Sequence, residues 1–239
     1  MLLHRISLDA PPPPPGSRLA LDGEEAWHAV AVKRVCAGDR VELLDGRGGV
    51  SVATVTQTDK RKGRAVVTLA VEAFERRPPH SPWVEVWSAM PRPDRAAQMI
   101  DQLAQVGAAA WRPLIAERSV TDAQAKGERL ARVAGEASKQ CGRAWHLHVR
   151  PALTVAEAAA WSAAHAGAAL LADAEGLSVR EAAENGVPER VVLVGPEGGF
   201  TEAETGVLRA GGARPLRLGP HVLRTETAAV AGAVALLAR

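Results

Sequence analysis

Several residue classes are scarce in this chain of 239 residues. The only cysteines are Cys36 and Cys141, which form no C-x-x-C pair, so the thiols can build neither a disulfide framework nor a structural zinc site. The formal net charge of +2 excludes a uniformly basic nucleic-acid coat but allows a local basic face. The most apolar stretch, Thr227 to Ala238, is far shorter than the ~20 residues that cross a bilayer, and the first residues show no apolar signal segment. We therefore expect a cytoplasmic protein without a membrane partner.

Aromatic residues are also few, and the chain has no tyrosine and only two phenylalanines. Four of the tryptophans, at positions 83, 87, 111 and 145, fall in predicted strands or at their ends, which favours bulky core residues over base-stacking platforms. His146 and His148 lie two residues apart, but no third ligand stands at metal-binding spacing. We expect no metal site.

The first 75 residues read as a small β-rich domain with one helix. A helix is predicted over Glu24 to Val35, and alternating runs predict strands at 40–44, 50–56 and 65–71. Five consecutive prolines, Pro11 to Pro15, predict a stiff loop. The segment from Arg76 to Pro82 combines charge with three prolines and is typical of a linker, so we place a domain boundary after residue 75.

Residues 76–239 alternate between strand and helix patterns. Such alternation predicts an α/β domain with a parallel sheet covered by helices. The predicted strands are 83–89, 110–115, 168–172, 191–194 and 215–218, and the predicted helices are 95–106, 126–140, 155–165, 202–210 and 226–238.

Two loops near the C-terminus carry the strongest functional signal, because ligands of open α/β sheets bind beyond the carboxyl ends of strands. The first, Gly195-Pro196-Glu197-Gly198-Gly199-Phe200, follows an apolar strand and precedes Thr201 and Glu204, which are spaced as a helix capping box. Its glycines allow a ligand to approach backbone amides, although a plain tight turn explains them as well. The second loop, Leu218 to Ala229, contains a Gly-Pro turn, His221, and Arg224 before a Thr-Glu-Thr helix start. Taken alone, Arg224 reads as a surface arginine and Thr225 as an ordinary N-cap.

Together these two loops resemble the RsmE family of ribosomal RNA methyltransferases, which belong to the SPOUT superfamily. The resemblance extends to Glu117-Arg118-Ser119, to residues 136–143 and to residues 38–46, and so covers nearly the whole chain. It implies a PUA-like RNA-binding β-barrel over residues 1–75 and a SPOUT methyltransferase domain over 76–239, with a C-terminal trefoil knot. It also implies a homodimer that transfers a methyl group from S-adenosylmethionine to N3 of a uridine in 16S ribosomal RNA of the small ribosomal subunit.

The family motifs imply a role for particular residues here. Cofactor binding is expected for one set of apolar side chains and loop residues, namely Leu171, Val194, Gly195, Glu197, Gly199, Leu218, Gly219 and Leu223. Arg224 is expected to stabilise negative charge on the uracil or to clamp a phosphate, and Glu226 to orient it. Both are therefore candidate catalytic residues.

Two basic segments are candidate RNA contacts. Lys60-Arg61-Lys62-Gly63-Arg64 is a dense cluster that fits either a phosphate patch or a solvated hairpin turn. Residues 112–150, which include Arg118, Lys139, Arg143 and Arg150, form a possible second strip.

Other functions stay open at this point. Asp101 to Gly107 lacks the lysine and glutamate of the corresponding family string, which leaves room for a paralogue with another RNA target. The remaining alternatives are another SPOUT reaction, such as 2′-O-methylation, and a non-catalytic RNA-binding protein whose pocket is vestigial.

Overall fold

The computed structural model describes residues 4–119, 127–184 and 186–238. Its contacts divide the chain into two compact units. The first comprises residues up to Pro79 together with Ser138–His146, and the second comprises His80–Ala137 and Leu147 onward.

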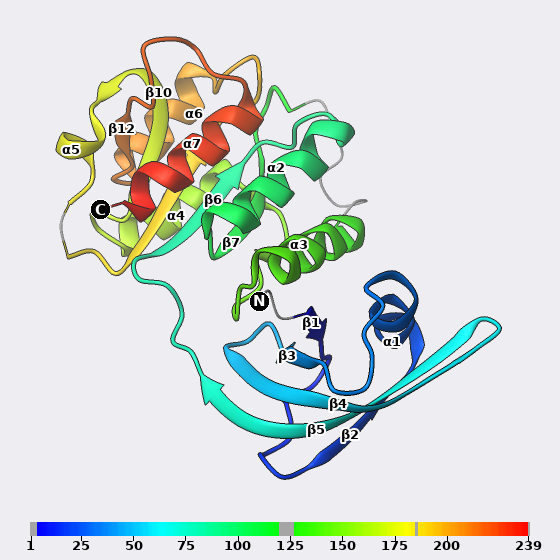
Figure 1. Ribbon diagram of the computed structural model, residues 1–239. Coiled ribbons are helices and arrows are strands. Elements are labelled where there is room, and N and C mark those ends of the chain that lie inside the picture. The colour runs from blue at the N-terminus through cyan, green and yellow to red at the C-terminus, as the bar shows by residue number, and fades with distance from the viewer. Residues whose placement is uncertain (1–3, 120–126, 185, 239) are drawn as a thin grey trace. The chain divides into compact units, whose positions relative to one another are not determined.

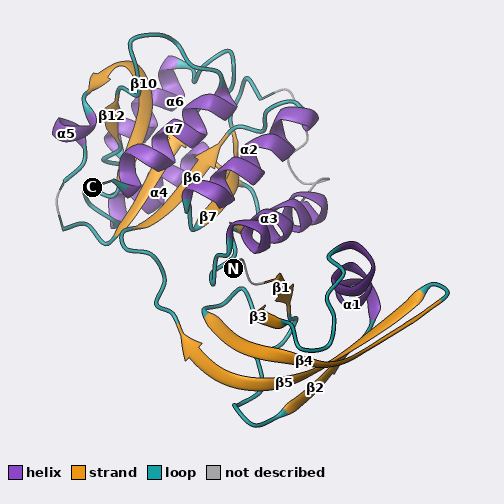
Figure 2. Ribbon diagram, in the orientation of Figure 1, coloured by secondary structure: helices purple, strands orange, loops and turns teal. Residues whose placement is uncertain are grey.

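The first unit is built on a curved five-stranded sheet (Figure 2). In spatial order its strands are β1 (His4–Ser7), β3 (Arg40–Leu44), β4 (Gly49–Arg61), β5 (Arg64–Arg76) and β2 (Arg18–Leu21). Alternate residues such as Val41, Leu43 and Leu69 are fully buried, because successive side chains of a strand point to opposite faces. The buried faces and one helical segment enclose an apolar core.

Sequence patterns located some of these elements but not all of their bounds. β4 and β5 are 13 residues each and continue through polar residues to the turn at Gly63, so the predicted strands were too short. β1 and β2, four residues each, were not predicted. The predicted helix is divided into α1 (Gly23–Trp27) and a π-helical turn over His28–Val32.

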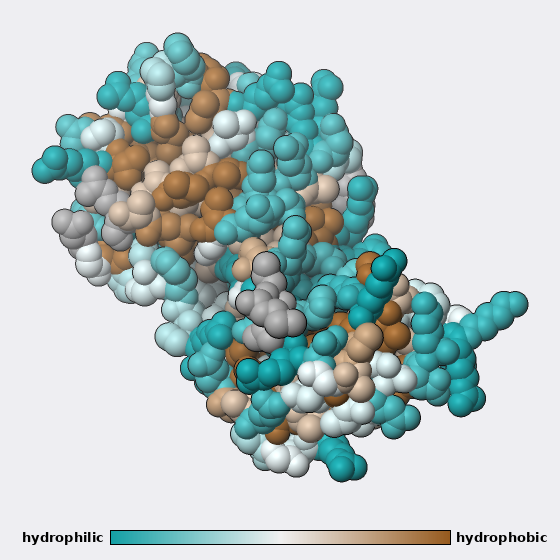
Figure 3. Space-filling view, viewed as in Figure 1, coloured by the Kyte–Doolittle hydropathy of each residue, from teal (hydrophilic) through white to brown (hydrophobic). Residues whose placement is uncertain are grey.

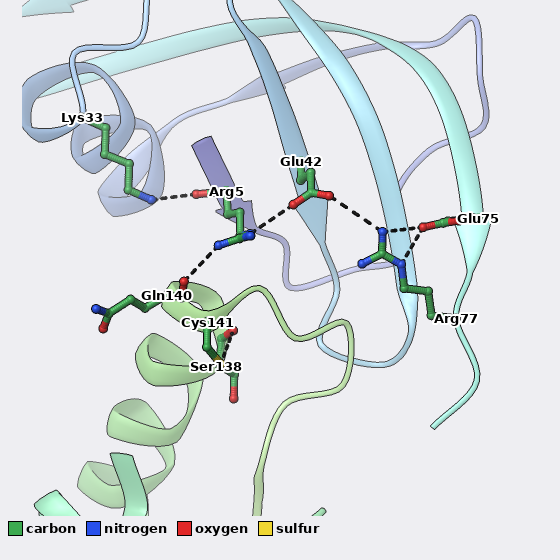
Figure 4. A network of polar contacts seen from close by, with 8 residues as sticks. All are labelled: Arg5, Lys33, Glu42, Glu75, Arg77, Ser138, Gln140 and Cys141. Carbon is green, nitrogen blue, oxygen red and sulfur yellow. Dashed lines mark hydrogen bonds and ion pairs between the residues drawn. The ribbon is translucent and has the colours of Figure 1, made fainter. Parts of the chain in front are cut away.

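The segment Ser138–His146 completes the first unit from a distant part of the sequence. Trp145 Nε1 donates to the carbonyl oxygen of Arg77 at 2.8 Å, and the Gly48 amide donates to the carbonyl oxygen of Ala144 at 2.8 Å. Figure 4 shows the polar side of this junction, where Arg5 binds Glu42 at 3.1 Å and the carbonyl oxygen of Gln140 at 3.0 Å. The boundary expected after residue 75 left this segment in the second domain.

The second unit contains a parallel sheet, as the alternating pattern predicted. Its order is β12 (Arg214–Leu216), β10 (Ala169–Leu177), β11 (Glu189–Val194), β6 (Trp83–Ser88), β7 (Ala110–Ile115) and β8 (His148–Val149), with β9 (Leu153–Thr154) pairing β7. All recorded pairs between these strands are parallel. The carboxyl ends of β10, β11 and β12 therefore lie at one edge of the sheet.

Helices cover both faces of this sheet (Figure 1). One face packs against α2 (Pro93–Val106), α3 (Gly127–Cys141) and α7 (Thr225–Leu237), and the other against α4 (Val155–Ala164) and α6 (Glu202–Ala210). A short helix, α5 (Val179–Ala182), follows β10. Trp111 and Trp87 are 0% and 3% exposed in these two cores, which confirms them as core residues. The trefoil knot stays a prediction.

Candidate functional site

The two C-terminal loops meet at a single cavity of about 340 Å³. The loop after β11 contributes one wall, and the segment from β12 to the start of α7 contributes the other, while β10 supplies the floor. The lining residues are Ala172, Asp173, Ala174, Val194, Gly195, Pro196, Glu197, Gly198, Gly199, Phe200, Leu216, Leu218, Gly219, His221, Val222, Leu223, Thr225 and Ala228.

A hydrogen bond joins the two loops at the base of the cavity. The Thr225 hydroxyl, on a side chain that is almost fully buried, donates to the carbonyl oxygen of Gly195 at 3.1 Å. Arg224, not Thr225, is the N-cap residue of α7, and no hydrogen bond of the Arg224 side chain to the helix end is present. Thr225 therefore fastens the two walls together instead of capping the helix.

Seven of the eight residues expected to bind a cofactor line this cavity, and Leu171 does not. Leu171 is 2% exposed and packs with α4 and α6 on the opposite face of the sheet. Successive residues of a strand point to opposite faces, and the next residue of β10, Ala172, lines the cavity. The sequence does not indicate on which face of the sheet the cavity opens, and the role of Leu171 in cofactor binding stays a prediction.

The walls combine apolar side chains with main-chain groups. Val194, Leu218 and Leu223 belong to or pack against the core on the α2 and α7 side, and they present an apolar surface to the cavity. Gly195, Gly199 and Gly219 line the cavity beside them and have no side chains to cover their backbone. Gly199 has φ of +69°, a left-handed conformation that favours glycine. Such a cleft suits a flat heterocycle with polar edges.

The capping box predicted for α6 is present and fixes the end of the first loop. The Glu204 amide donates to Thr201 Oγ1 at 3.2 Å, and Thr201 N donates to Glu204 Oε2 at 2.9 Å. The loop after β7 adds two contacts, because the Glu117 amide donates to Glu204 Oε1 at 2.7 Å and Arg118 donates to the Gly198 carbonyl oxygen at 2.7 Å. The motif Glu117-Arg118-Ser119 thus lies against the cavity loop.

The two candidate catalytic residues lie beside the cavity lining rather than in it. Arg224 is exposed, and among the described residues its guanidinium makes no hydrogen bond or ion pair. Glu226 binds Arg95 of α2 at 3.2 Å, so the expectation that Glu226 orients Arg224 is not supported by this arrangement. Its second oxygen, Oε2, is buried with no hydrogen-bond partner among the described groups.

Other lining residues were not found from the sequence. Ala172, Asp173 and Ala174 lie within β10, and Leu216 ends β12. The rule that ligands bind beyond the carboxyl ends of strands could have pointed to them. Asp173 already binds Arg209 at 2.7 Å. His221, which the sequence left between a pocket and a solvent role, both lines the cavity and is exposed.

The second basic strip is not a free charged surface. Lys139 is 4% exposed and binds Glu25 at 2.6 Å, and Arg150 binds Glu85 at 3.1 Å. Burial lowers the pKa of Arg143. The expectation was wrong for Lys139, because this residue of α3 is buried and the Glu25 carboxylate neutralises its charge.

No group of three or more His, Cys, Asp and Glu side chains in residues 4–119, 127–184 and 186–238 is arranged to hold a metal ion. In those same ranges no helix combines the length and the apolar character required to cross a bilayer.

Two family models match the chain. Residues 78–237 match an RNA methyltransferase domain, and residues 21–68 match an RNA methyltransferase PUA domain. The first match contains the parallel sheet and the cavity, and the second lies within the first unit. Fold and site together define an RNA methyltransferase.

Similarity to known proteins shows to which family of RNA methyltransferases the chain belongs. Ribosomal RNA small subunit methyltransferase E of Mycobacterium bovis is 34% identical over 243 residues, covering 94% of this chain and 88% of the relative. A methyltransferase of Legionella pneumophila, solved with its bound cofactor SAM, is 27% identical, has a TM-score of 0.83, and is aligned over 100% of this chain and 98% of its own. The Neisseria gonorrhoeae ribosomal RNA small subunit methyltransferase E, at 23% identity and TM-score 0.83 over 99% of this chain and 98% of its own, shares the fold. This chain belongs to the ribosomal RNA small subunit methyltransferase E family.

Proposed function

We propose that this protein transfers a methyl group from S-adenosylmethionine to N3 of a uridine in 16S ribosomal RNA. The observation that carries the proposal is the single cavity formed by the two C-terminal loops and fastened by the Thr225 to Gly195 hydrogen bond. The relative from Mycobacterium bovis is named for small-subunit ribosomal RNA, and the Legionella structure holds SAM.

The cavity fits this cofactor by size and by the character of its walls. Its volume of about 340 Å³ lies within the range of small-molecule pockets. Val194, Leu218 and Leu223 would hold the adenine ring, and the main chain of Gly195, Gly199 and Gly219 would bind its polar edge. Glu197, exposed at the rim, is placed to accept hydrogen bonds from a ribose or an amino group.

The protein's own chemical task is small. Bound S-adenosylmethionine supplies a methyl group that its sulfonium already activates, so the chain mainly orients the uracil and stabilises the charge left when N3 loses its proton. Arg224 is the residue assigned to this charge. Its exposed guanidinium, one residue before the cavity-lining Thr225, is not engaged by any described carboxylate. It is therefore available to a nucleotide.

The role that we propose for Glu226 differs from the one expected from the sequence. Its ion pair with Arg95 ties the first turn of α7 to α2 and so holds the N-cap residue Arg224, two positions earlier, beside the cavity. Glu226 is proposed as a support of the helix end, acting through the backbone and not through the Arg224 side chain.

Replacing Arg224 tests the assignment directly. Arg224→Ala should lower methyl transfer to 16S ribosomal RNA by at least about 100-fold, the scale of losing one transition-state donor, while the affinity for S-adenosylmethionine changes by less than a few fold. Arg180→Ala, which removes an exposed arginine of α5, serves as the matched control and should retain full activity. Mass spectrometry of the modified RNA identifies the base and the atom. A variant that loses cofactor affinity in step with activity would reassign Arg224 to cofactor binding.

We also propose that the protein acts in the cytoplasm as a homodimer. One side of α7 carries Val230, Val234 and Leu237 at helical spacing, and of these Val234 is exposed while Val230 and Leu237 are half-buried against the core. Figure 3 shows apolar surface gathered where Figure 1 draws this helix. An unpaired apolar stripe of this kind is typical of an interface between subunits.

A further inference from the structure

The cavity loop is held from outside the cavity as well as from within it. The loop after β7, residues Ala116–Ser119, lines no part of the cavity, yet it supplies two hydrogen bonds to the segment Gly195–Glu204. Its own shape is fixed by a turn in which the Ser119 amide donates to the Ala116 carbonyl oxygen at 3.0 Å and the Ala116 amide donates to Ser119 Oγ at 3.1 Å. This turn presents Glu117 and Arg118 to the cavity loop.

The contact of Arg118 falls on the peptide group that closes the cavity turn. Its guanidinium donates to the carbonyl oxygen of Gly198 at 2.7 Å. The amide of the same peptide group, Gly199 N, donates to the carbonyl oxygen of Pro196 at 2.8 Å and closes a four-residue turn. The C=O and N–H of a trans peptide point in opposite directions, so holding one fixes the direction of the other.

Glycine makes this turn dependent on an external contact. Gly198 and Gly199 are adjacent, and glycine has the widest choice of backbone conformations, so the peptide between them has little intrinsic preference for the orientation observed. The Arg118 side chain also packs on Gly198, where an added Cβ would approach Arg118 Cδ to 3.3 Å. The arginine thus supplies both a hydrogen bond and a steric backing.

We infer that Arg118 is a positioning residue that holds the Pro196–Gly199 turn in the conformation that binds the cofactor. The inference rests on the proposed function, since it assigns the turn to S-adenosylmethionine. Arg118 acts through the Gly198 carbonyl and lies outside the cavity lining, so it is not a catalytic residue.

Calorimetric titration of the full-length protein with S-adenosylmethionine tests this inference. Arg118→Ala should bind the cofactor roughly tenfold more weakly than the unmodified chain, because one charge-assisted hydrogen bond that preorganises the site is lost. Arg118→Lys keeps a cationic donor on a long side chain and should recover part of the affinity. Arg214→Ala is the control, because Arg214 donates to the carbonyl oxygen of Glu181 at 2.8 Å and to Glu184 Oε1 at 2.7 Å, and neither residue belongs to this loop.

Two further readouts separate positioning from a general loss of structure. Hydrogen exchange should quicken in a peptide covering residues 195–201 of Arg118→Ala while β11 stays protected, and the melting temperature should match that of Arg214→Ala. In steady-state assays KM for the cofactor should rise while kcat at saturating cofactor changes by less than about twofold.

The outcomes distinguish this inference from the function on which it rests. If the unmodified chain binds no S-adenosylmethionine, the proposed function fails. If the unmodified chain binds it and Arg118→Ala binds it equally well, or if kcat falls while KM is unchanged, only the role given to Arg118 is overturned.

Discussion

Thr154 and Thr201 occupy the same position in two helices of one unit, and only one of them adjoins the cavity. Each accepts a hydrogen bond from the amide three residues later at 3.2 Å, and each helix has a complete capping box. Thr154 precedes α4, whereas Thr201 immediately follows the loop that lines the cavity. Variants of these two threonines therefore separate the effect of a helix cap on stability from its effect on the cavity.

Thr201→Ala and Thr154→Ala should each lower the free energy of unfolding by about 1 kcal/mol, the usual loss on removing a threonine cap. Chemical denaturation measures this change. Only Thr201→Ala should also weaken binding of S-adenosylmethionine, by a few fold, because the end of the cavity loop is then held less firmly. Equal cofactor affinity in the two variants would show that the cap does not shape the cavity.

At the scale of elements, the β4–β5 hairpin carries the basic cluster expected from the sequence. Lys60, Arg61, Lys62 and Arg64 are exposed at its tip, and the recorded ion pair there joins Arg61 to Asp59 at 3.3 Å. Lys60 Nζ lies 5.2 Å from the centre of the Trp27 ring. The hairpin therefore presents several cations to solvent, as a contact with an RNA backbone requires.

Replacing Lys60, Arg61 and Lys62 together with glutamate should weaken RNA binding and flatten its salt dependence. If each cation neutralises one phosphate, the slope of log K against log salt should fall by about 2, at about 0.7 for each contact to a single strand. Filter binding over a range of salt concentrations measures the slope.

A control for net charge reverses three exposed arginines outside the hairpin, at positions 18, 180 and 217. This variant should leave the slope closer to that of the unmodified chain. Equal slopes for the two triple variants would remove the hairpin from the RNA contact.

Elements with strong local signals were predictable from the sequence. The bounds of β3 and α6 agree with the predicted ranges, because turn residues and a capping box mark their ends. β10 was predicted to end at residue 172 but runs to Leu177 through Asp173 and Glu175, where a register shift breaks the alternation. The local periodicity of the sequence does not indicate that the strand continues through such a shift.

The site was predictable for the same reason and to the same extent. The glycine-rich turns were found because glycine and proline indicate a turn from the local sequence alone. These turns do line one cavity. The packing of Leu171 away from the cavity and the Arg95–Glu226 pair were not predicted, since both depend on which face of the sheet and which distant helix lie opposite. Such partners, 131 residues apart in the case of the ion pair, leave no periodic signal.

At the scale of the whole molecule, the proposed dimer depends on the exposed face of α7. Val234 is 48% exposed on this helix, and Val207 is 47% exposed on α6, which covers the opposite face of the sheet. The two valines are thus matched in chemistry and exposure. They differ in that Val234 belongs to the apolar stripe.

Val234→Asp should convert the protein from dimer to monomer at micromolar concentration, because a carboxylate would have to be buried without a partner in the interface. Val207→Asp should leave the dimer intact. Light scattering coupled to size-exclusion chromatography measures the mass of each. A monomeric unmodified chain, or the same mass for both variants, would contradict the assignment of α7 to the interface.

The most direct measurement is a calorimetric titration of the unmodified full-length chain with S-adenosylmethionine. The cavity formed by the two C-terminal loops predicts saturable binding with one site per chain. Absence of binding, with the protein folded and the cofactor intact, would contradict the assignment of that cavity and with it the proposed methyl transfer.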